Sequence, residues 1–192
     1  MTGKVTVTEA DGKPTAAGVE VIVYVVGFTE PASATPVTVK QKGRRFVPEL
    51  DAVTLGGKVT FPNEDAFLHN VFSQSSSRKF DLGSFKKGEA KTKEFPSPGV
   101  VDVYCNIHPE MVAKVVVVDG PFWAVTGKDG SFTMAGVPPG TYPLVAYGGD
   151  GKEVRTEVTV TVGGTTTAKL EVAKPAAQPH LRKDGTPYGR YK

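Results

Sequence analysis

The chain has 192 residues, enough for one large domain or two small ones, and its hydrophobic fraction of 39% excludes a chain that is disordered throughout. A single Cys excludes an internal disulfide framework and metal sites built from Cys alone. A net charge of +3 without a basic stripe among aromatic residues argues against a nucleic acid partner, and no apolar run is long enough to span a membrane.

The predicted secondary structure is β strand from end to end, with Gly- and Pro-rich turns between the strands. Alternating or Val-rich runs recur along the chain, whereas no stretch keeps a helical period over three turns. The expected strands, in chain order, are Lys4–Thr8, Val19–Val26, Lys58–Phe61, Val100–Tyr104, Ala113–Val118, Tyr142–Tyr147, Glu153–Val162 and Thr165–Val172. Short strands joined by such turns predict an all-β chain built of sandwiches or barrels.

Two breaks in composition divide the chain. Residues 29–36 (TEPASATP) form a Pro- and Ala-rich linker, and Asp119-Gly-Pro follows a very apolar strand and restarts the chain. The piece before the first break has only two predicted strands, and an isolated hairpin is marginal in water, so it needs a partner sheet. The predicted division is residues 1–34 with 121–173 as one smaller sandwich, residues 35–120 as a domain inserted into it, and residues 174–192 as a mobile basic tail.

The turns of the two ends follow a shared pattern. They read Gly3-Lys-Val-Thr-Val, Asp11-Gly-Lys-Pro and Gly18-Val-Glu-Val at the front, and run from Thr126 to Tyr142 at the back. In these residues the two ends resemble the carboxypeptidase regulatory-like (transthyretin-like) sandwich. In that family the fold is usually an accessory module, so the resemblance implies no chemistry for this part of the chain.

The informative stretch is residues 104–111 (YCNIHPEM), in which Cys105, His108 and Met111 follow an apolar strand at intervals of three, with His69 upstream. One thiolate, two imidazoles and a weak thioether suit both oxidation states of copper. Zinc prefers a closed tetrahedral site of strong donors, and a Met thioether is a poor zinc ligand. Three ligands share one loop and His69 comes from another strand, so we expect only the folded sandwich to complete a site for one copper ion.

Each of these residues taken alone also has a structural interpretation. A lone Cys is most often a small buried hydrophobe, a lone Met fills gaps in a core, and His108-Pro can be a simple turn. The chain has only 3 His and 3 Met, however, and four candidate ligands fall into two tight clusters. The remaining His180 lies in the tail, where we expect a solvated polar side chain.

The spacing of Cys105, His108 and Met111 is similar to the short ligand loop of amicyanin, and the flanking runs at residues 59–63 and 95–99 fit as well. Over about residues 36–119 the chain therefore resembles the cupredoxins, the single-copper blue proteins that include plastocyanin and amicyanin. The resemblance implies a Greek-key β sandwich, with His69 and His108 binding copper through a ring nitrogen, Cys105 through sulfur and Met111 axially.

The resemblance also assigns roles around the ligands. It implies that Asn70 ties the two ligand segments together and that its backbone amide donates to the sulfur of Cys105; the alternative is an ordinary turn residue. It implies an apolar electron port beside the ligand-loop His, formed here by Phe67, Ile107 and Pro109; the alternative is that Phe67 and Ile107 fill the core.

These observations predict a type 1 copper protein that carries single electrons. We expect it not to be an enzyme, because copper oxidases and nitrite reductases need further His-rich sites. The alternatives are copper storage, delivery or sensing, and a structural module with a vestigial site. We expect redox partner proteins to dock near His108. We also expect a periplasmic or otherwise exported location, since thiolate-bound copper fares poorly against cytosolic thiols, although the first residues lack a signal-peptide pattern.

Overall fold

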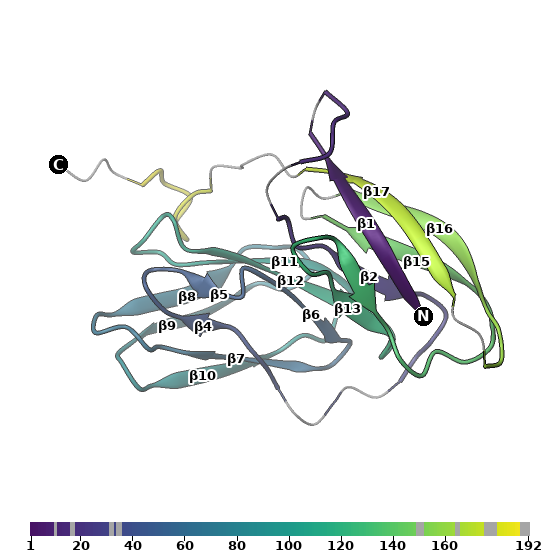
Figure 1. The fold of residues 1–192 in the computed structure, drawn as a ribbon. Coiled ribbons are helices and arrows are strands. Elements are labelled where there is room, and N and C mark those ends of the chain that lie inside the picture. Colours follow the sequence, from purple (N-terminus) through teal and green to yellow (C-terminus); the bar gives the residue numbers. More distant parts are fainter. Residues whose placement is uncertain are drawn as a thin grey trace. The chain divides into compact units, whose positions relative to one another are not determined.

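The computed structural model describes residues 1–9, 11–15, 18–30, 33, 36–148, 152–163, 166–174 and 180–188. Their regular structure is all β strand, which confirms the predicted fold class (Figure 1). The chain divides into two compact units, namely unit 1 (Met1–Pro31 with Val118–Ala176) and unit 2 (Ala32–Val117 with Ala177–Lys192). Within the described ranges, no helix has the length and apolar character needed to cross a membrane.

Unit 1 is built from both ends of the chain. One sheet has the order β14-β1-β17 and the other the order β13-β2-β15-β16. The first and last strands of the chain pair directly: β1 runs parallel to β17, with Val5 opposite Leu170. The strands are β1 (Thr2–Thr8), β2 (Ile22–Val25), β13 (Trp123–Val125), β14 (Ser131–Thr133), β15 (Gly140–Tyr147), β16 (Glu153–Val160) and β17 (Thr167–Ala173).

Alternation of side chains gives unit 1 its core. In β17 every second residue is buried, namely Ala168, Leu170 and Val172, while the residues between them are exposed. Because side chains of a strand point alternately to its two faces, this pattern places one face of the sheet on the core. Val5 and Val23, near the start of the chain, belong to the same apolar cluster as Leu170 near its end, so both ends of the chain are needed to close the core.

Unit 2 contains a five-stranded sheet of order β6-β12-β11-β8-β9, a three-stranded sheet of order β10-β7-β3, and the short pair β4-β5. Its strands are β3 (Val37–Thr38), β4 (Lys40–Gln41), β5 (Phe46–Val47), β6 (Leu50–Thr54), β7 (Lys58–Pro62), β8 (His69–Ser73), β9 (Phe80–Phe85), β10 (Ala90–Glu94), β11 (Gly99–Tyr104) and β12 (Val112–Val118). Phe46, Phe61 and Phe95 are fully buried in the core of this unit. The same apolar cluster includes Cys105 and Met111, so two predicted ligands lie within the core.

Residues 180–188, which the sequence assigns to a mobile tail, belong to unit 2. The ring of His180 stacks on that of Tyr104, with 4.2 Å between centroids and 13° between planes. His180 is therefore half-buried rather than the solvated side chain we expected, because an aromatic neighbour covers one face of its ring. The Tyr188 hydroxyl donates to the carbonyl oxygen of Cys105 at 2.7 Å.

Candidate metal centre

Two antiparallel strands bring the predicted ligands together. Tyr104, the last residue of β11, lies opposite Phe72 of β8. Because the strands run in opposite directions, the chain that leaves β11 passes back along β8 toward its first residue, His69. All five residues of β8 are buried, which fixes His69 inside the unit. Cys105 follows β11 directly and therefore reaches the same place.

The loop between β11 and β12 closes on itself through its backbone. The N–H of Cys105 donates to the carbonyl oxygen of Met111 at 3.2 Å, and the N–H of Met111 donates to that of His108 at 3.1 Å. Cys105 and Met111 are fully buried, whereas His108 is half-buried. The loop thus holds a thiol and a thioether toward the core and presents one imidazole near the surface.

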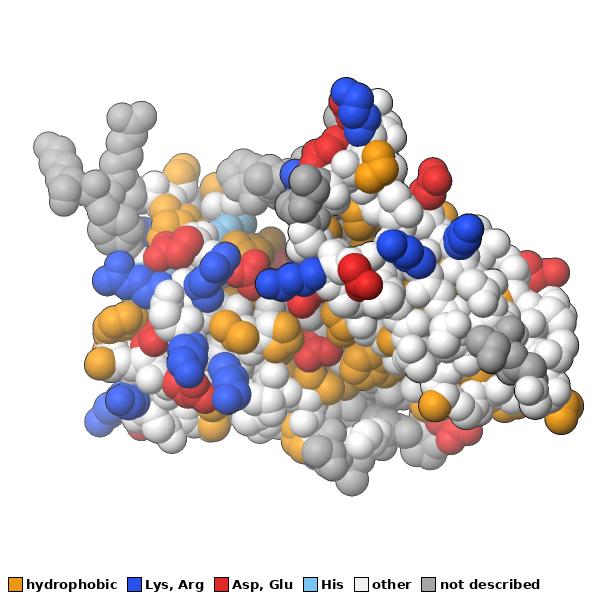
Figure 2. Space-filling model, in the orientation of Figure 1, with side chains coloured by type: hydrophobic (Ala, Val, Ile, Leu, Met, Phe, Trp, Pro, Cys, Tyr) orange, Lys and Arg blue, Asp and Glu red, His pale blue; other side chains and the backbone are white. Residues whose placement is uncertain are grey.

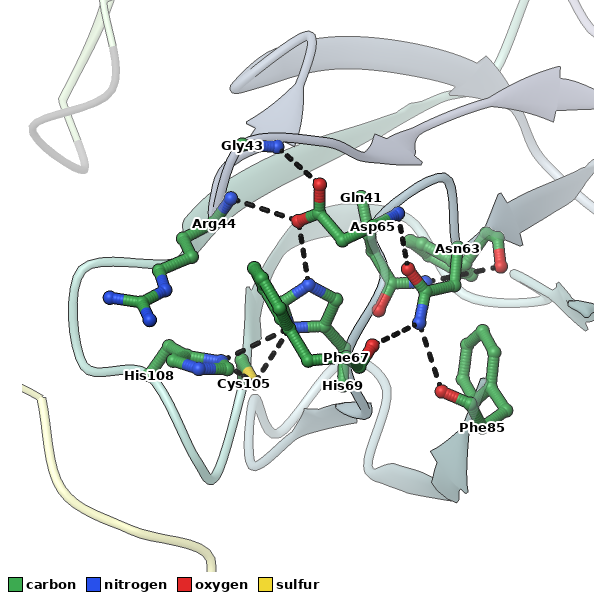
Figure 3. A network of polar contacts seen from close by, with 11 residues as sticks. Gln41, Gly43, Arg44, Asn63, Asp65, Phe67, His69, Phe85, Cys105 and His108 are labelled. Carbon is green, nitrogen blue, oxygen red and sulfur yellow. Dashed lines mark hydrogen bonds and ion pairs between the residues drawn. The ribbon is translucent and has the colours of Figure 1, made fainter. Parts of the chain in front are cut away.

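The donor atoms of three predicted ligands converge (Figure 3). The Nδ1 atoms of His69 and His108 lie 3.1 Å apart, and the Sγ atom of Cys105 lies 4.0 Å from the first and 3.7 Å from the second. A trigonal arrangement of two nitrogens about 2.0 Å and one sulfur about 2.3 Å from an ion has N–N and N–S separations of about 3.5 and 3.7 Å. The residues present therefore fit a single metal ion, and together with Met111 they form the donor set that copper prefers.

A carboxylate that the sequence analysis did not single out holds His69 in place. The Nε2 atom of His69 lies 2.8 Å from Oδ2 of Asp65. The backbone N–H groups of Gly43 and Arg44 donate to the two carboxylate oxygens of Asp65, at 2.7 and 2.9 Å (Figure 3). Metal-binding His residues commonly donate their second ring N–H to a carboxylate, which orients the ring and leaves the other nitrogen for the metal. Asp65 leaves Nδ1 of His69 free to bind in this way.

The electrostatics of the site favour a thiolate. Burial raises the pKa of the Cys105 thiol, but hydrogen bonds outweigh burial and the net shift is downward. These bonds come from the ring of His69 and from the backbone N–H groups of Asn70, Ile107 and His108. A lowered thiol pKa provides the anionic sulfur that a soft metal binds.

The two imidazoles shift in opposite directions. Burial lowers the pKa of His69, but its contacts with Cys105 and Asp65 outweigh burial and raise it. Burial and the charge of His69 together lower the pKa of His108. His108 is therefore neutral at neutral pH, and the lone pair of one ring nitrogen can bind a metal ion.

The backbone and the side chain of Asn70 have different partners. Its backbone N–H donates to the sulfur of Cys105. Its side-chain Nδ2 donates to Oδ1 of Asp81 on β9 at 2.8 Å, so the side chain ties β8 to its hairpin partner rather than to the ligand loop. Asp81 also accepts a hydrogen bond from Nζ of Lys183 at 2.8 Å. Through this bond the segment 180–188 contacts a neighbour of Asn70.

The residues expected to form an electron port beside His108 differ in their exposure. Phe67 is 42% exposed, and its ring centroid lies 5.8 Å from that of His108. Leu68, which the sequence analysis passed over, is 51% exposed. Ile107 is partly buried and packs against the core, and Pro109 is half-buried.

Comparison with known proteins gives similarities to two kinds of protein. Residues 112–168 match the family described as polysaccharide lyase family 4, domain II. The probable rhamnogalacturonate lyases A of Neosartorya fischeri and Aspergillus fumigatus are each 42% identical over 52 residues, or 27% of this chain. The chain spans only 10% of the length of these relatives. The expected resemblance of the two ends to the carboxypeptidase regulatory-like sandwich stays a prediction.

Solved structures similar to this one include amicyanin variants, a purple cupredoxin and a copper-containing nitrite reductase. A reduced amicyanin variant is 25% identical, with half of this chain and 97% of amicyanin covered and a TM-score of 0.41. A purple cupredoxin from Nitrosopumilus maritimus is 24% identical over 42% of this chain and 98% of its own, with a TM-score of 0.38. A copper-containing nitrite reductase from Thermus scotoductus is 26% identical over 51% of this chain and 26% of its own, with a TM-score of 0.43.

Proposed function

We propose that this chain binds one copper ion through His69, Cys105, His108 and Met111 and acts as a one-electron carrier. The observation that carries the proposal is the convergence of two Nδ1 atoms and one Sγ atom at separations of 3.1–4.0 Å inside a β-sheet unit. When bound, copper supplies a reversible one-electron couple. The chain supplies donors suited to both oxidation states.

The surroundings of the donors support electron transfer over metal delivery. His69 is fully buried and bonded to Asp65, and Cys105 and Met111 are fully buried. A buried, hydrogen-bonded donor set resists movement when the metal changes charge, whereas a delivery site must open readily to release its ion. Among the described residues, His69, Cys105 and His108 are the one group of three or more His, Cys, Asp and Glu side chains placed to hold a metal ion. We therefore propose a carrier rather than an enzyme.

Electrons would enter and leave through His108, the ligand nearest the surface. Phe67, whose ring centroid lies 5.8 Å from that of His108, and the adjacent Pro109 give this edge an apolar character. On the face drawn in Figure 2, basic and acidic side chains are interspersed, so charge of one sign does not dominate there. We propose that redox partner proteins dock on the apolar edge around His108, and that the protein works in the periplasm or another exported compartment.

Unit 1 has no comparable cluster among its described residues, and we propose that it is an accessory sandwich. The family match at residues 112–168 includes strands of unit 1, and the chain spans 10% of the length of the probable rhamnogalacturonate lyase A it resembles. A match of that size supports a shared structural module rather than a shared activity.

Copper titration followed by visible absorption and voltammetry tests the proposal. One equivalent of copper should produce an intense thiolate-to-copper band and a reversible one-electron wave. Cys105→Ser should abolish the band while the far-ultraviolet circular dichroism stays that of a β protein. Absence of stoichiometric copper binding, or a band that persists in Cys105→Ser, would overturn the assignment.

A further inference from the structure

The segment 180–188 contacts the ligand loop from outside. The hydroxyl of Tyr188 donates to the carbonyl oxygen of Cys105 at 2.7 Å, and the backbone N–H of Lys183 donates to Oδ1 of Asn106 at 3.0 Å. The N–H of Cys105 is already bonded inside the loop, to Met111. The segment therefore satisfies the remaining backbone group of the predicted thiolate ligand.

The same segment also contacts the β8–β9 hairpin, which carries the predicted ligand His69. The Nζ atom of Lys183 lies 2.8 Å from Oδ2 of Asp81, and the Nε2 atom of Gln74 donates to the carbonyl oxygen of Lys183 at 2.9 Å. Asp81 in turn accepts from the side chain of Asn70, the residue after His69. Lys183 thus joins the β8–β9 hairpin to the ligand loop through its backbone and its side chain together.

Aromatic packing fixes where the segment lies. His180 stacks on Tyr104, and Tyr188 meets His180 edge to face, with 5.1 Å between centroids and 70° between planes. The guanidinium of Arg182 lies 5.4 Å from the centroid of the Tyr188 ring. Ring pairs of this geometry add stabilisation beyond the area they bury, so the Tyr188 hydroxyl is presented to Cys105 by its neighbours.

We propose that residues 180–188 form a strap that positions the copper ligands, with Tyr188 and Lys183 as its positioning residues. The inference rests on the proposed copper site and names the part of the chain that fixes it from outside. Cys105 is then held on three sides: by Met111 within the loop, by the N–H of Asn70 at its sulfur, and by Tyr188 at its carbonyl. Release of the last contact leaves the thiolate free to shift against the two imidazoles.

Point variants of the full chain test the strap with little change of volume. Tyr188→Phe removes only the hydroxyl, and Lys183→Met removes the charge while keeping the backbone bonds. Leu181→Ser is the matched control, because Leu181 lies in the same segment and is 52% exposed. We expect Tyr188→Phe to lose copper to a Cu(I) chelator about two- to tenfold faster, the range that corresponds to one neutral hydrogen bond. It should also shift the thiolate-to-copper band, while Leu181→Ser matches the wild type.

A second measurement separates failure of the strap from failure of the copper site. In the metal-free protein, the rate at which a thiol reagent modifies Cys105 reports how well the loop is held, and it needs no copper. We expect this rate to rise in Tyr188→Phe and to match the wild type in Leu181→Ser. Unchanged thiol reactivity and unchanged copper loss in Tyr188→Phe would overturn the strap, whether or not the wild type binds copper. A wild type that binds no copper but shows the expected thiol reactivities would overturn the proposed function alone.

Discussion

Units 1 and 2 are both Val-rich β structures, yet they differ in what they bury. Among the described residues, the buried polar side chains of unit 2 are Gln41, Thr54, Asn63, His69, Asn70 and Ser73, whereas unit 1 buries Thr126. Thr126 has a structural role, because its Oγ1 accepts from the N–H of Val21 at 3.0 Å. Burying polar groups is costly unless they are bonded, so their concentration around β8 indicates that this region is built for more than packing.

The difference is visible in the bonds that these groups make (Figure 3). Asn63 donates to the carbonyl oxygens of Phe67 and Phe85 at 2.9 and 3.0 Å, and its Oδ1 accepts from the N–H of Asp65. Asp65 then bonds His69. A buried amide thus shapes the turn that presents the carboxylate, and the carboxylate orients the ligand. In unit 2, the buried side chain of Asn63 and the carboxylate of Asp65 thus serve to position His69.

The largest effect is expected where this network meets the ligand. Asp65→Asn replaces a charged acceptor with a neutral one, so His69 is less well oriented. We expect copper affinity to fall about ten- to a hundredfold, the usual range for a partner of a metal-binding His. Competition with a Cu(I) chelator measures the change.

Glu64→Gln is the matched control for Asp65→Asn. The neighbouring Glu64 forms ion pairs with Lys40 and Lys42 at 3.0 and 3.5 Å, and partly exposed pairs of this kind contribute little. Its copper affinity should match the wild type. Equal losses in both variants would show that the charge of this turn matters rather than the bond to His69.

A smaller effect is expected at the apolar edge. Phe67→Lys places a charge beside Arg44, whose guanidinium lies 5.2 Å from the Phe67 ring centroid, so two copies should repel one another where they exchange electrons. We expect the electron self-exchange rate to fall about tenfold while the absorption spectrum stays unchanged. Nuclear magnetic resonance line broadening in mixtures of the two redox states gives this rate.

Unit 1 supplies the control for the apolar edge. Val162 is 85% exposed, so Val162→Lys adds the same charge to an exposed apolar position in the other unit. Its self-exchange rate should stay near that of the wild type. If the rate falls equally in both variants, net charge explains the loss and the edge around His108 is not the electron port.

The smallest effect on the copper site is expected from Thr126→Val. This variant leaves the buried N–H of Val21 without its acceptor, so the free energy of unfolding of unit 1 should fall by about 1–3 kcal/mol. The single Trp of the chain, Trp123, lies in unit 1 and reports its unfolding by fluorescence. A changed copper spectrum in this variant would contradict the separation of roles between the two units.

The sequence was most informative where residue types are rare. With 3 His, 3 Met and 1 Cys in the chain, the spacing of four of them stood out, and the structure brings the donor atoms of three, His69, Cys105 and His108, within 4.8 Å of one another. The all-β class followed from alternation and turn residues, although strands such as β9 and β10, with charged or irregular patterns, were not predicted.

Long-range partners were beyond the reach of sequence patterns. Asp65 is one of 20 acidic residues, and its role depends on backbone N–H groups of Gly43 and Arg44, far away in the chain. In the sequence, the one hint of this role is that Asp65 stands four residues before His69. Tyr188 contacts Cys105 across 83 positions from a segment without periodicity, so nothing local marked it.

X-ray absorption at the copper edge of the loaded protein tests the central claim most directly. We predict one copper ion with two nitrogen neighbours from the imidazoles and one short sulfur neighbour from the thiolate. A shell of nitrogen and oxygen neighbours without sulfur would contradict it.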